Sequence, residues 1–177
     1  MKKIPLTKGT YAIVDDSDYD EMMKVNWYCA KSYKTQYAQR ELYLGGGRKN
    51  RIRKTIQMHR CILGRKIGFF VDHINGNGLD NRRCNLRHVT ASQSAMNRPK
   101  RSDSKNKYKG VCRKVNHKGA RPVSYFCAGI IIDGKAKDVG YFKSELEAAL
   151  KYDELALKHY GEYARLNFPD NTGVTKA

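Results

Sequence analysis

The sequence D-H-I-N-G-N at residues 72–77 decides how this chain is interpreted. It places a carboxylate beside an imidazole and follows both with asparagine and glycine residues typical of a tight loop. N-L-R follows at residues 85–87, and N-R-P at residues 97–99. The pattern predicts a strand, a loop, a second strand and a short helix. A carboxylate, an imidazole and amides at this spacing indicate metal-assisted cleavage of DNA.

The chemistry of phosphodiester hydrolysis assigns roles to the first two residues. The reaction needs an activated water and a counter-charge for the transition state, which one base and one metal ion can supply. The ordinary pKa of histidine is about 6.5, so His73 is mostly neutral at pH 7 and is the predicted general base. Asp72 is the predicted ligand of one divalent ion, because a hard carboxylate oxygen suits Mg²⁺ or Mn²⁺. Neighbouring strand residues face opposite sides, but a twisted strand end allows both to serve one site.

Residues 71–90 resemble the HNH homing endonucleases of phages and introns. The resemblance rests on His73, on Asn85 in N-L-R, and on a helical position before Asn97. It implies a ββα-metal nuclease in which Asn85 holds the loop that orients the histidine. The family pattern S-Q-N-x-x-N is replaced by S-Q-S-A-M-N at residues 92–97, so Ser94 takes the position of a metal ligand. A hydroxyl is a weaker donor than an amide oxygen, so we expect reduced metal affinity, with Asn97 as the alternative ligand.

The composition predicts a folded protein that binds a polyanion. In 177 residues, 35 Lys and Arg against 17 Asp and Glu give a net charge of +18, and 40% of residues are hydrophobic. Duplex DNA is the expected partner, although RNA-binding proteins are equally basic. The predicted DNA-binding residues are Arg82, Arg83, Arg87, Arg98, Lys100, Arg101, Lys105, Lys109, Arg113, Lys114, Phe126, Lys135 and Lys137.

Two further features of composition concern redox state and location. The five cysteines are odd in number and contain no C-x-x-C pair, so we expect reduced, mostly buried thiols and no zinc site. No apolar segment approaches the length of a membrane span, and residues 1–9 contain no signal-like apolar run. The sequence therefore predicts a cytoplasmic protein, in the host cytoplasm if a phage encodes it.

The chain is predicted to be α+β and to divide into consecutive segments. A β-rich, DNA-contacting region covers residues 1–58, and its helix is expected to start at the capping pattern S-x-x-D of residues 17–20. The nuclease covers 59–98, a basic linker 99–107, a third folded segment 108–169 and a tail 170–177. Asp133-Gly134 predicts a two-residue hairpin turn, and T-x-x-Q at residues 90–93 and S-x-x-E at residues 144–147 each predict the start of a helix. One face of the second of these helices is expected to carry Leu146, Ala149, Leu150, Leu157 and Tyr160. Asp153 lies within that apolar stripe, so it needs a buried hydrogen-bond partner.

The third segment resembles the ethylene-responsive-factor DNA-binding domain of the APETALA class. The resemblance rests on Y-K-G-V at 108–111, G-Y-F at 140–142 and A-R-L-N-F-P at 164–169. It implies a three-stranded antiparallel sheet that enters the major groove, with one helix behind it. Phe126 stands where that family often has tryptophan. Cys127 and Gly129 replace common arginines, so we expect relaxed sequence selectivity.

Two functions remain open at this stage, together with a weaker third. The first is a DNA endonuclease of the HNH homing type that nicks duplex DNA. The second is a DNA-binding regulator in which the HNH segment survives as a catalytically impaired scaffold, an interpretation favoured by Ser94. An RNA-binding protein is the third, and it would prefer structured RNA to duplex DNA.

Overall fold

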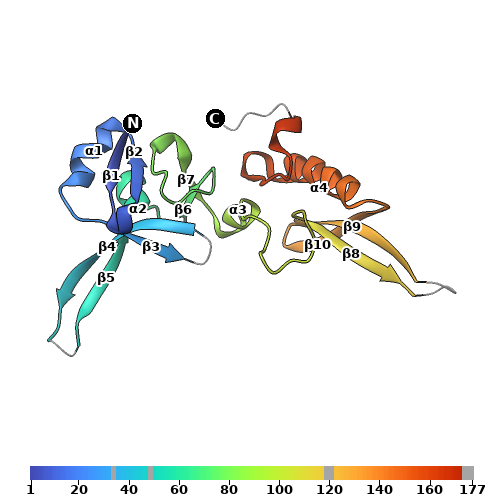
Figure 1. Ribbon diagram of the computed structural model, residues 1–177, viewed down its shortest axis with the longest axis horizontal. Helices are drawn as coiled ribbons and strands as arrows, with labels where there is room; N and C mark the ends of the chain where they lie inside the picture. Colours follow the sequence, from blue (N-terminus) through green and yellow to red (C-terminus); the bar gives the residue numbers. More distant parts are fainter. Residues whose placement is uncertain (33–34, 48–49, 118–121, 173–177) are drawn as a thin grey trace. The chain divides into compact units, whose positions relative to one another are not determined.

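A computed structural model of the chain describes residues 1–32, 35–47, 50–117 and 122–172. Most of the predicted tail, residues 173–177, lies outside the described residues. The fold is mixed α/β, with several small antiparallel sheets and few helices (Figure 1). The chain separates into two compact units, Met1–Ser94 and a second unit that begins at Ala95. No helix in the described ranges is long and apolar enough to cross a membrane.

The first unit contains three small antiparallel sheets. They have the strand orders β1-β2, β3-β4-β5 and β6-β7. The elements are β1 (Lys2–Pro5), β2 (Tyr11–Val14), α1 (Asp16–Met23), β3 (Tyr28–Ser32), β4 (Thr35–Gly45), β5 (Ile52–Gln57), α2 (Met58–Leu63), β6 (Phe70–His73), β7 (Leu86–Val89) and α3 (Ala91–Met96), which extends past the boundary of the unit. Short 3₁₀ turns cover Thr7–Gly9 and Arg83–Asn85. In Figure 1 the β4–β5 hairpin projects from the rest of this unit.

The hydrophobic core of the first unit contains buried residues from both predicted segments, 1–58 and 59–98. Ile4, Val14 and Trp27 from the first segment are buried together with Ile62 and Leu86 from the second. Strands β6 and β7 have only four residues each, and a pair this short needs other elements to bury its apolar side. The nuclease segment is therefore completed by the N-terminal strands and helix.

Strand β2 also braces the loop between β6 and β7. The amide of Ile13 donates to the carbonyl of Leu79 at 2.8 Å, and the amide of Asn81 donates to the carbonyl of Ile13 at 2.8 Å. Helix α1 differs slightly from the prediction, because its N-cap is Asp15 and no side chain caps it. The Asp15 carboxylate instead accepts from the backbone amide of Arg83 at 2.7 Å. A long-range contact has thus replaced the local cap that the sequence suggested.

The second unit is a three-stranded antiparallel sheet packed on one helix. Its elements are β8 (Val111–Asn116), β9 (Val123–Ile132), β10 (Lys135–Phe142), α4 (Glu145–Tyr160) and the 3₁₀ turns Gly161–Tyr163 and Pro169–Thr172, with strand order β10-β9-β8. The hairpin turn is confirmed, since Asp133 and Gly134 have φ of 52° and 74°. The start of α4 is confirmed too, because the Ser144 hydroxyl accepts from the Glu147 amide at 3.2 Å.

The buried face of α4 differs from the leucine-rich stripe that periodicity predicts. Leu146 and Leu150 are 49% and 43% exposed, and the buried residues are Ala148, Ala149, Tyr152, Asp153 and Ala156. Small alanines let the helix lie close to the sheet. A Cβ atom at Gly110 would lie 1.9 Å from the Tyr152 ring, so glycine is required where the ring packs. Close packing has therefore selected small residues over large ones at this interface.

The buried carboxylate of Asp153 joins α4 to the following chain segment. It accepts from the Asn167 amide at 2.8 Å, from Asn167 Nδ2 at 3.0 Å and from the Phe168 amide at 2.8 Å. The sequence alone does not identify a partner for Asp153, and in the structure the partner is the backbone fourteen and fifteen residues further along. The contact fixes the end of the second unit against its helix.

Replacing Asp153 by alanine is expected to destabilise the second unit by about 3 kcal/mol, because buried donors lose a charged acceptor. The measurement is hydrogen exchange of the Asn167 and Phe168 amides, which should exchange about 100-fold faster if this unit opens. Glu154→Ala is the matched control, since that exposed carboxylate contacts only Lys151. Equal protection in both variants would show that Asp153 does not hold this segment.

Candidate active site

His73 is the last residue of β6, and its side chain is 5% exposed. Its Nε2 atom lies 3.2 Å from Asn81 Oδ1, and Asn81 Nδ2 in turn donates to the Leu79 carbonyl at 3.2 Å. Because an amide oxygen only accepts, Nε2 carries the ring proton in this pair. The lone pair of the neutral ring is then on Nδ1. The orientation of His73 is set by the loop that follows it.

The electrostatic surroundings of His73 favour its neutral form. Burial lowers the pKa of His73, while the hydrogen bond to Asn81 and the charges of Asp72 and Asp80 oppose this effect. The net direction is downward from the ordinary value of 6.5. A neutral imidazole at pH 7 is the form that a general base requires.

A second histidine, His59, lies directly beside His73. It is the second residue of α2, is 4% exposed, and its ring centroid is 4.9 Å from that of His73 in an edge-to-face arrangement. The Tyr37 ring lies 5.7 Å from His59 and 5.9 Å from His73. Burial, followed by the charge of His73, lowers the pKa of His59 to about 3. His59 Nδ1 has no hydrogen-bond partner within the described part of the chain.

The sequence alone does not connect the two histidines. His59 lies before the D-H-I-N-G-N motif and beside Arg60, which favours a structural or phosphate-facing role over that of a ligand. No periodicity relates a residue at the start of one helix to a residue at the end of the next strand. The packing of α2 against β6 brings them together, and only the tertiary structure contains this information.

Asn85 makes the contacts that a loop-holding residue requires. Its Nδ2 donates to Asn75 Oδ1 at 3.1 Å and to the Asp80 carbonyl at 2.7 Å. Its Oδ1 accepts from the Asn75 amide at 3.0 Å, and its carbonyl accepts from the Ile74 amide at 2.9 Å. Both the oxygen and the nitrogen of the buried Asn85 side-chain amide therefore hold the loop after His73 against the start of β7.

Asp72 lies opposite Arg87 across β6 and β7 and forms an ion pair with it. Asp72 Oδ2 is 3.3 Å from Arg87 Nε and 3.2 Å from Nη2, and both side chains are largely buried. A single carboxylate fits Mg²⁺ or Mn²⁺, which keep several waters, and does not fit a structural zinc ion. Among the described residues no three His, Cys, Asp or Glu side chains gather to hold a metal. A cation at Asp72 would therefore depend on amide, hydroxyl, water and phosphate oxygens for its other ligands.

The helix that carries the remaining predicted ligands begins as expected. The Thr90 amide donates to Gln93 Oε1 at 2.9 Å and the Gln93 amide donates to Thr90 Oγ1 at 3.3 Å, which is a reciprocal capping box. Ser94 is half-buried in α3, and Asn97 is buried just after it, within the second unit. The metal-binding roles of both residues remain predictions.

The three arginines predicted to hold phosphate near the loop each contact an aspartate. Arg82 makes two bonds to Asp80, of 2.7 and 2.6 Å, and Arg83 makes two bonds to Asp18, of 2.8 and 2.7 Å. The third is Arg87, which pairs with Asp72. The hydrogen bond from Arg82 holds the pKa of Asp80 below its ordinary value. These arginines fix the loop, and much of their charge is compensated before any phosphate arrives.

The basic segment 99–107, predicted to be a linker along phosphates, is held by its own contacts. Lys100 Nζ donates to the carbonyls of Ser104 and Asn106 at 3.3 and 2.7 Å, and Arg101 pairs with Asp103 at 2.7 Å. Lys109 Nζ similarly donates to the Met96 carbonyl at 2.5 Å. The side chains of Arg98 and Lys105 are exposed.

The strand register separates the predicted DNA-binding residues of the second unit onto two faces. Arg113 lies opposite Phe126, which packs against the core under α4, so both belong to the covered face. Lys135 and Lys137 lie opposite Ile132 and Ile130, and these positions share that face. Lys114 lies opposite Tyr125 on the open face and pairs with Asp138. The open face therefore presents Lys114 and the Tyr125–Tyr141 ring pair, with Phe126 in the core instead.

The expectation of mostly buried cysteines is wrong. All five cysteines are free, but only Cys127 is buried. Cys29 and Cys112 are half-buried, and Cys61 and Cys84 are exposed. Cys61 lies within α2, and Cys84 lies within the 3₁₀ turn Arg83–Asn85.

Comparisons with known proteins show which family this chain resembles. The sequence model of a family described as HNH endonuclease matches residues 64–96, which cover β6, the loop, β7 and α3. A relative from Acanthamoeba polyphaga mimivirus, described as an uncharacterized HNH endonuclease, is 32% identical over 167 residues, or 90% of this chain and 76% of the relative. No solved structure matches the chain. The extent of the mimivirus match shows that this chain belongs to the HNH endonuclease family.

Proposed function

We propose that this protein is a divalent-metal-dependent DNA endonuclease of the homing type, with His73 as its general base. The single observation that carries the proposal is a buried, neutral-favoured imidazole whose orientation is fixed by Asn81 and by the loop that Asn85 holds. One chain has one such centre, so each binding event is proposed to nick one strand of the duplex.

The residues divide the work of hydrolysis among themselves. With its proton on Nε2, His73 accepts a proton from water at Nδ1, and Asn81 stabilises the cationic ring that results. Asp72 would hold the divalent ion, with Ser94 as a further ligand. When bound, such an ion supplies counter-charge to the phosphate and to the departing oxygen. Asn85 keeps the strand end and loop in place throughout.

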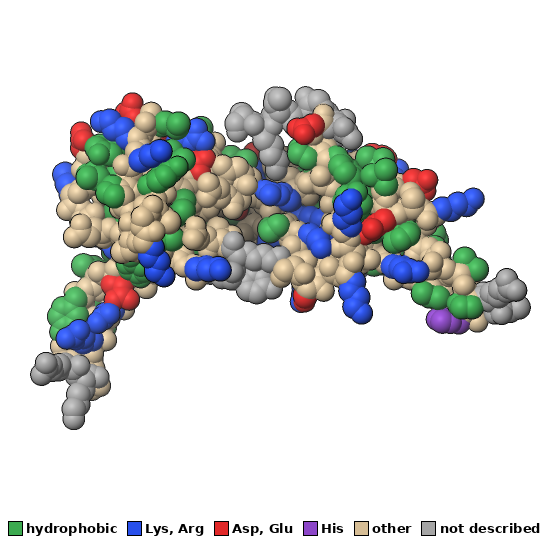
Figure 2. All heavy atoms as spheres, viewed as in Figure 1, with side chains coloured by type: hydrophobic (Ala, Val, Ile, Leu, Met, Phe, Trp, Pro, Cys, Tyr) green, Lys and Arg blue, Asp and Glu red, His purple; other side chains and the backbone are tan. Residues whose placement is uncertain are grey.

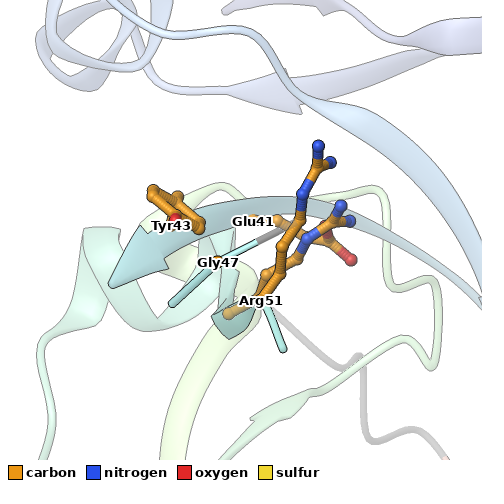
Figure 3. A pocket seen from close by; sticks show the side chains of 5 residues that line it. Glu41, Tyr43, Gly47 and Arg51 are labelled. Atoms are coloured by element: carbon orange, nitrogen blue, oxygen red, sulfur yellow. The ribbon is translucent and has the colours of Figure 1, made fainter. Parts of the chain in front are cut away.

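DNA binding is proposed to involve both units. The projecting β4–β5 hairpin exposes Tyr43 and Ile52, and a shallow pocket of about 490 Å³ on it is lined partly by Glu41, Arg51 and Arg53. The side chain of Arg51 is one of those that line this pocket (Figure 3). Lys and Arg side chains are spread over the visible surface of each unit (Figure 2). For the second unit we propose an ethylene-responsive-factor-like role, with the open sheet face in the major groove.

The test is incubation of the purified protein with supercoiled plasmid and Mg²⁺ or Mn²⁺. The proposal predicts relaxed circles that depend on the metal and disappear with EDTA. Conversion to linear DNA at low protein concentration would contradict single-strand nicking. Tight binding to duplex DNA without any relaxed product would contradict the enzyme and support a regulator.

The regulator is retained as a second candidate because of two observations. Ser94 replaces the amide expected at a ligand position, and the Asp72 carboxylate is engaged by Arg87. Both features weaken a cation site. In this alternative the protein binds its target with the same surfaces but does not hydrolyse it.

Ser94→Asn is expected to raise Mg²⁺ affinity and the nicking rate by about threefold to tenfold, because an amide oxygen is a stronger ligand than a hydroxyl. The measurement is the nicking rate as a function of Mg²⁺ concentration. Ser92→Asn, two positions earlier on the same helix, is the matched control. If the Ser94 variant has unchanged metal dependence, Ser94 is not what limits the site.

A further inference from the structure

A basic and apolar loop lies between α2 and β6, directly before the active-site strand. This 64–70 loop and the adjoining residues surround a pocket of about 340 Å³. Three cations line it, namely Arg60, Arg65 and Lys66, together with the apolar side chains of Ile67 and Phe69. None of the described residues that line the pocket is acidic.

The cations of this pocket differ from the arginines of the neighbouring loop. Arg82 and Arg83 each make two bonds to an aspartate. Within the described parts of the chain, Arg60, Arg65 and Lys66 form no ion pair with a carboxylate. Their charge is therefore uncompensated on the protein side, and it is concentrated in seven consecutive residues. A phosphate-rich ligand is the complementary partner.

The same loop exposes large apolar side chains to solvent. Ile67 is 94% exposed, and Phe69 and Phe70 are 38% and 49% exposed. Lys66 Nζ lies 4.3 Å from the centre of the Phe69 ring, and the Phe69 amide donates to the Lys66 carbonyl at 3.1 Å. Such exposed apolar groups are unfavourable in water, and proteins that bend DNA insert similar side chains between base steps.

The position of the pocket relates it to the site of cleavage. Phe70 and Val71 of β6 line the pocket, and the same strand ends at His73. A strand rises about 3.3 Å per residue, so three residues place the pocket about 10 Å from His73, the proposed general base. One DNA strand advances about 3.4 Å per nucleotide along the axis, so this distance corresponds to about three nucleotides.

We propose that the 64–70 loop binds the duplex within about three nucleotides of the bond that is cut. Arg60, Arg65 and Lys66 contact backbone phosphates, and Ile67 makes an apolar contact with the bases. This inference rests on the proposed function, since it assigns the pocket to the same DNA. It explains why Arg82 and Arg83 can bind aspartates and fix the catalytic loop: the 64–70 loop, at the other end of β6, binds the phosphates.

The test compares Arg65→Gln/Lys66→Gln with a double control, Lys24→Gln/Lys158→Gln, which removes the same charge from two exposed positions, the C-cap of α1 and the last turn of α4. Binding to a duplex that contains the nicking site is measured by fluorescence anisotropy across salt concentrations. The loop variant should bind at least tenfold more weakly, and the slope of log affinity against log salt should fall by about two. The slope measured for the control should differ from the wild-type slope by no more than about half a unit.

Ile67→Ala tests the apolar contact independently of charge. We expect threefold to tenfold weaker binding with an unchanged salt slope, because no phosphate contact is removed. If the double loop variant keeps the wild-type slope and affinity, the inference is overturned even when the wild type nicks DNA. If the wild type binds but never nicks, the proposed enzyme fails, while the salt slopes still decide whether the loop binds DNA.

Discussion

Replacing His73 by alanine is expected to lower the single-turnover rate constant for nicking by about 100-fold to 10,000-fold, the usual contribution of a general base. Affinity for duplex DNA should change by less than about twofold, because the ring is 5% exposed and its bonded partner is Asn81. The measurement is plasmid relaxation with enzyme in excess, together with anisotropy for binding.

His159→Ala is the matched control for that experiment. His159 is an exposed residue near the end of α4 and has no predicted role. Its nicking rate should equal that of the wild type. A His73→Ala variant that still folds, binds DNA and nicks within tenfold of the wild-type rate would remove the imidazole from the mechanism.

The second large effect concerns stability in acid and arises from His59. Burial lowers the pKa of this residue from 6.5 to about 3, so between these values the unfolded chain binds a proton that the folded chain does not. The contribution of neutral His59 to the free energy of unfolding is therefore fully present above pH 6.5. It falls as the pH decreases, by about 1.4 kcal/mol per pH unit. Over the whole window the loss amounts to about 5 kcal/mol.

Urea unfolding followed by the fluorescence of Trp27 measures this loss directly. Trp27 is the single tryptophan and is buried in the same core. His59→Phe keeps a ring beside His73 but cannot titrate, so its stability should fall less steeply between pH 6.5 and pH 4. His159→Gln, which alters an exposed ring, should behave as the wild type. Identical pH dependence in His59→Phe and wild type would exclude His59 as the cause.

The parts of the fold that sequence patterns predicted are those fixed by neighbours in the chain. The capping boxes at Thr90 and Ser144 and the Asp133-Gly134 turn depend on residues one to three positions apart. The need of Asp153 for a buried partner was likewise evident from its position among apolar residues. Local hydrogen bonding and turn geometry determine such features, so a single sequence is enough to predict them.

The parts that could not be predicted depend on contacts between distant segments. The Asp18–Arg83 pair joins residues 65 positions apart, and it reassigns an arginine expected on phosphate. The His59–His73 ring contact arises in the same way. In the second unit, alternation alone could not say which sheet face α4 covers, and so Phe126 was expected on the wrong face. Pairing register and tertiary packing decide these points.

The central claim is that Asp72 and His73 act on one phosphodiester, the carboxylate for the cation and the imidazole for the water. The most direct test is the nicking rate against Mg²⁺ concentration for Asp72→Asn, Arg87→Gln and His73→Ala. We predict that Asp72→Asn raises the half-saturating Mg²⁺ at least tenfold, whereas His73→Ala lowers the plateau only. Arg87→Gln breaks the same ion pair but keeps the carboxylate, so its half-saturating Mg²⁺ should be equal or lower. An unchanged Mg²⁺ dependence in Asp72→Asn would contradict the account.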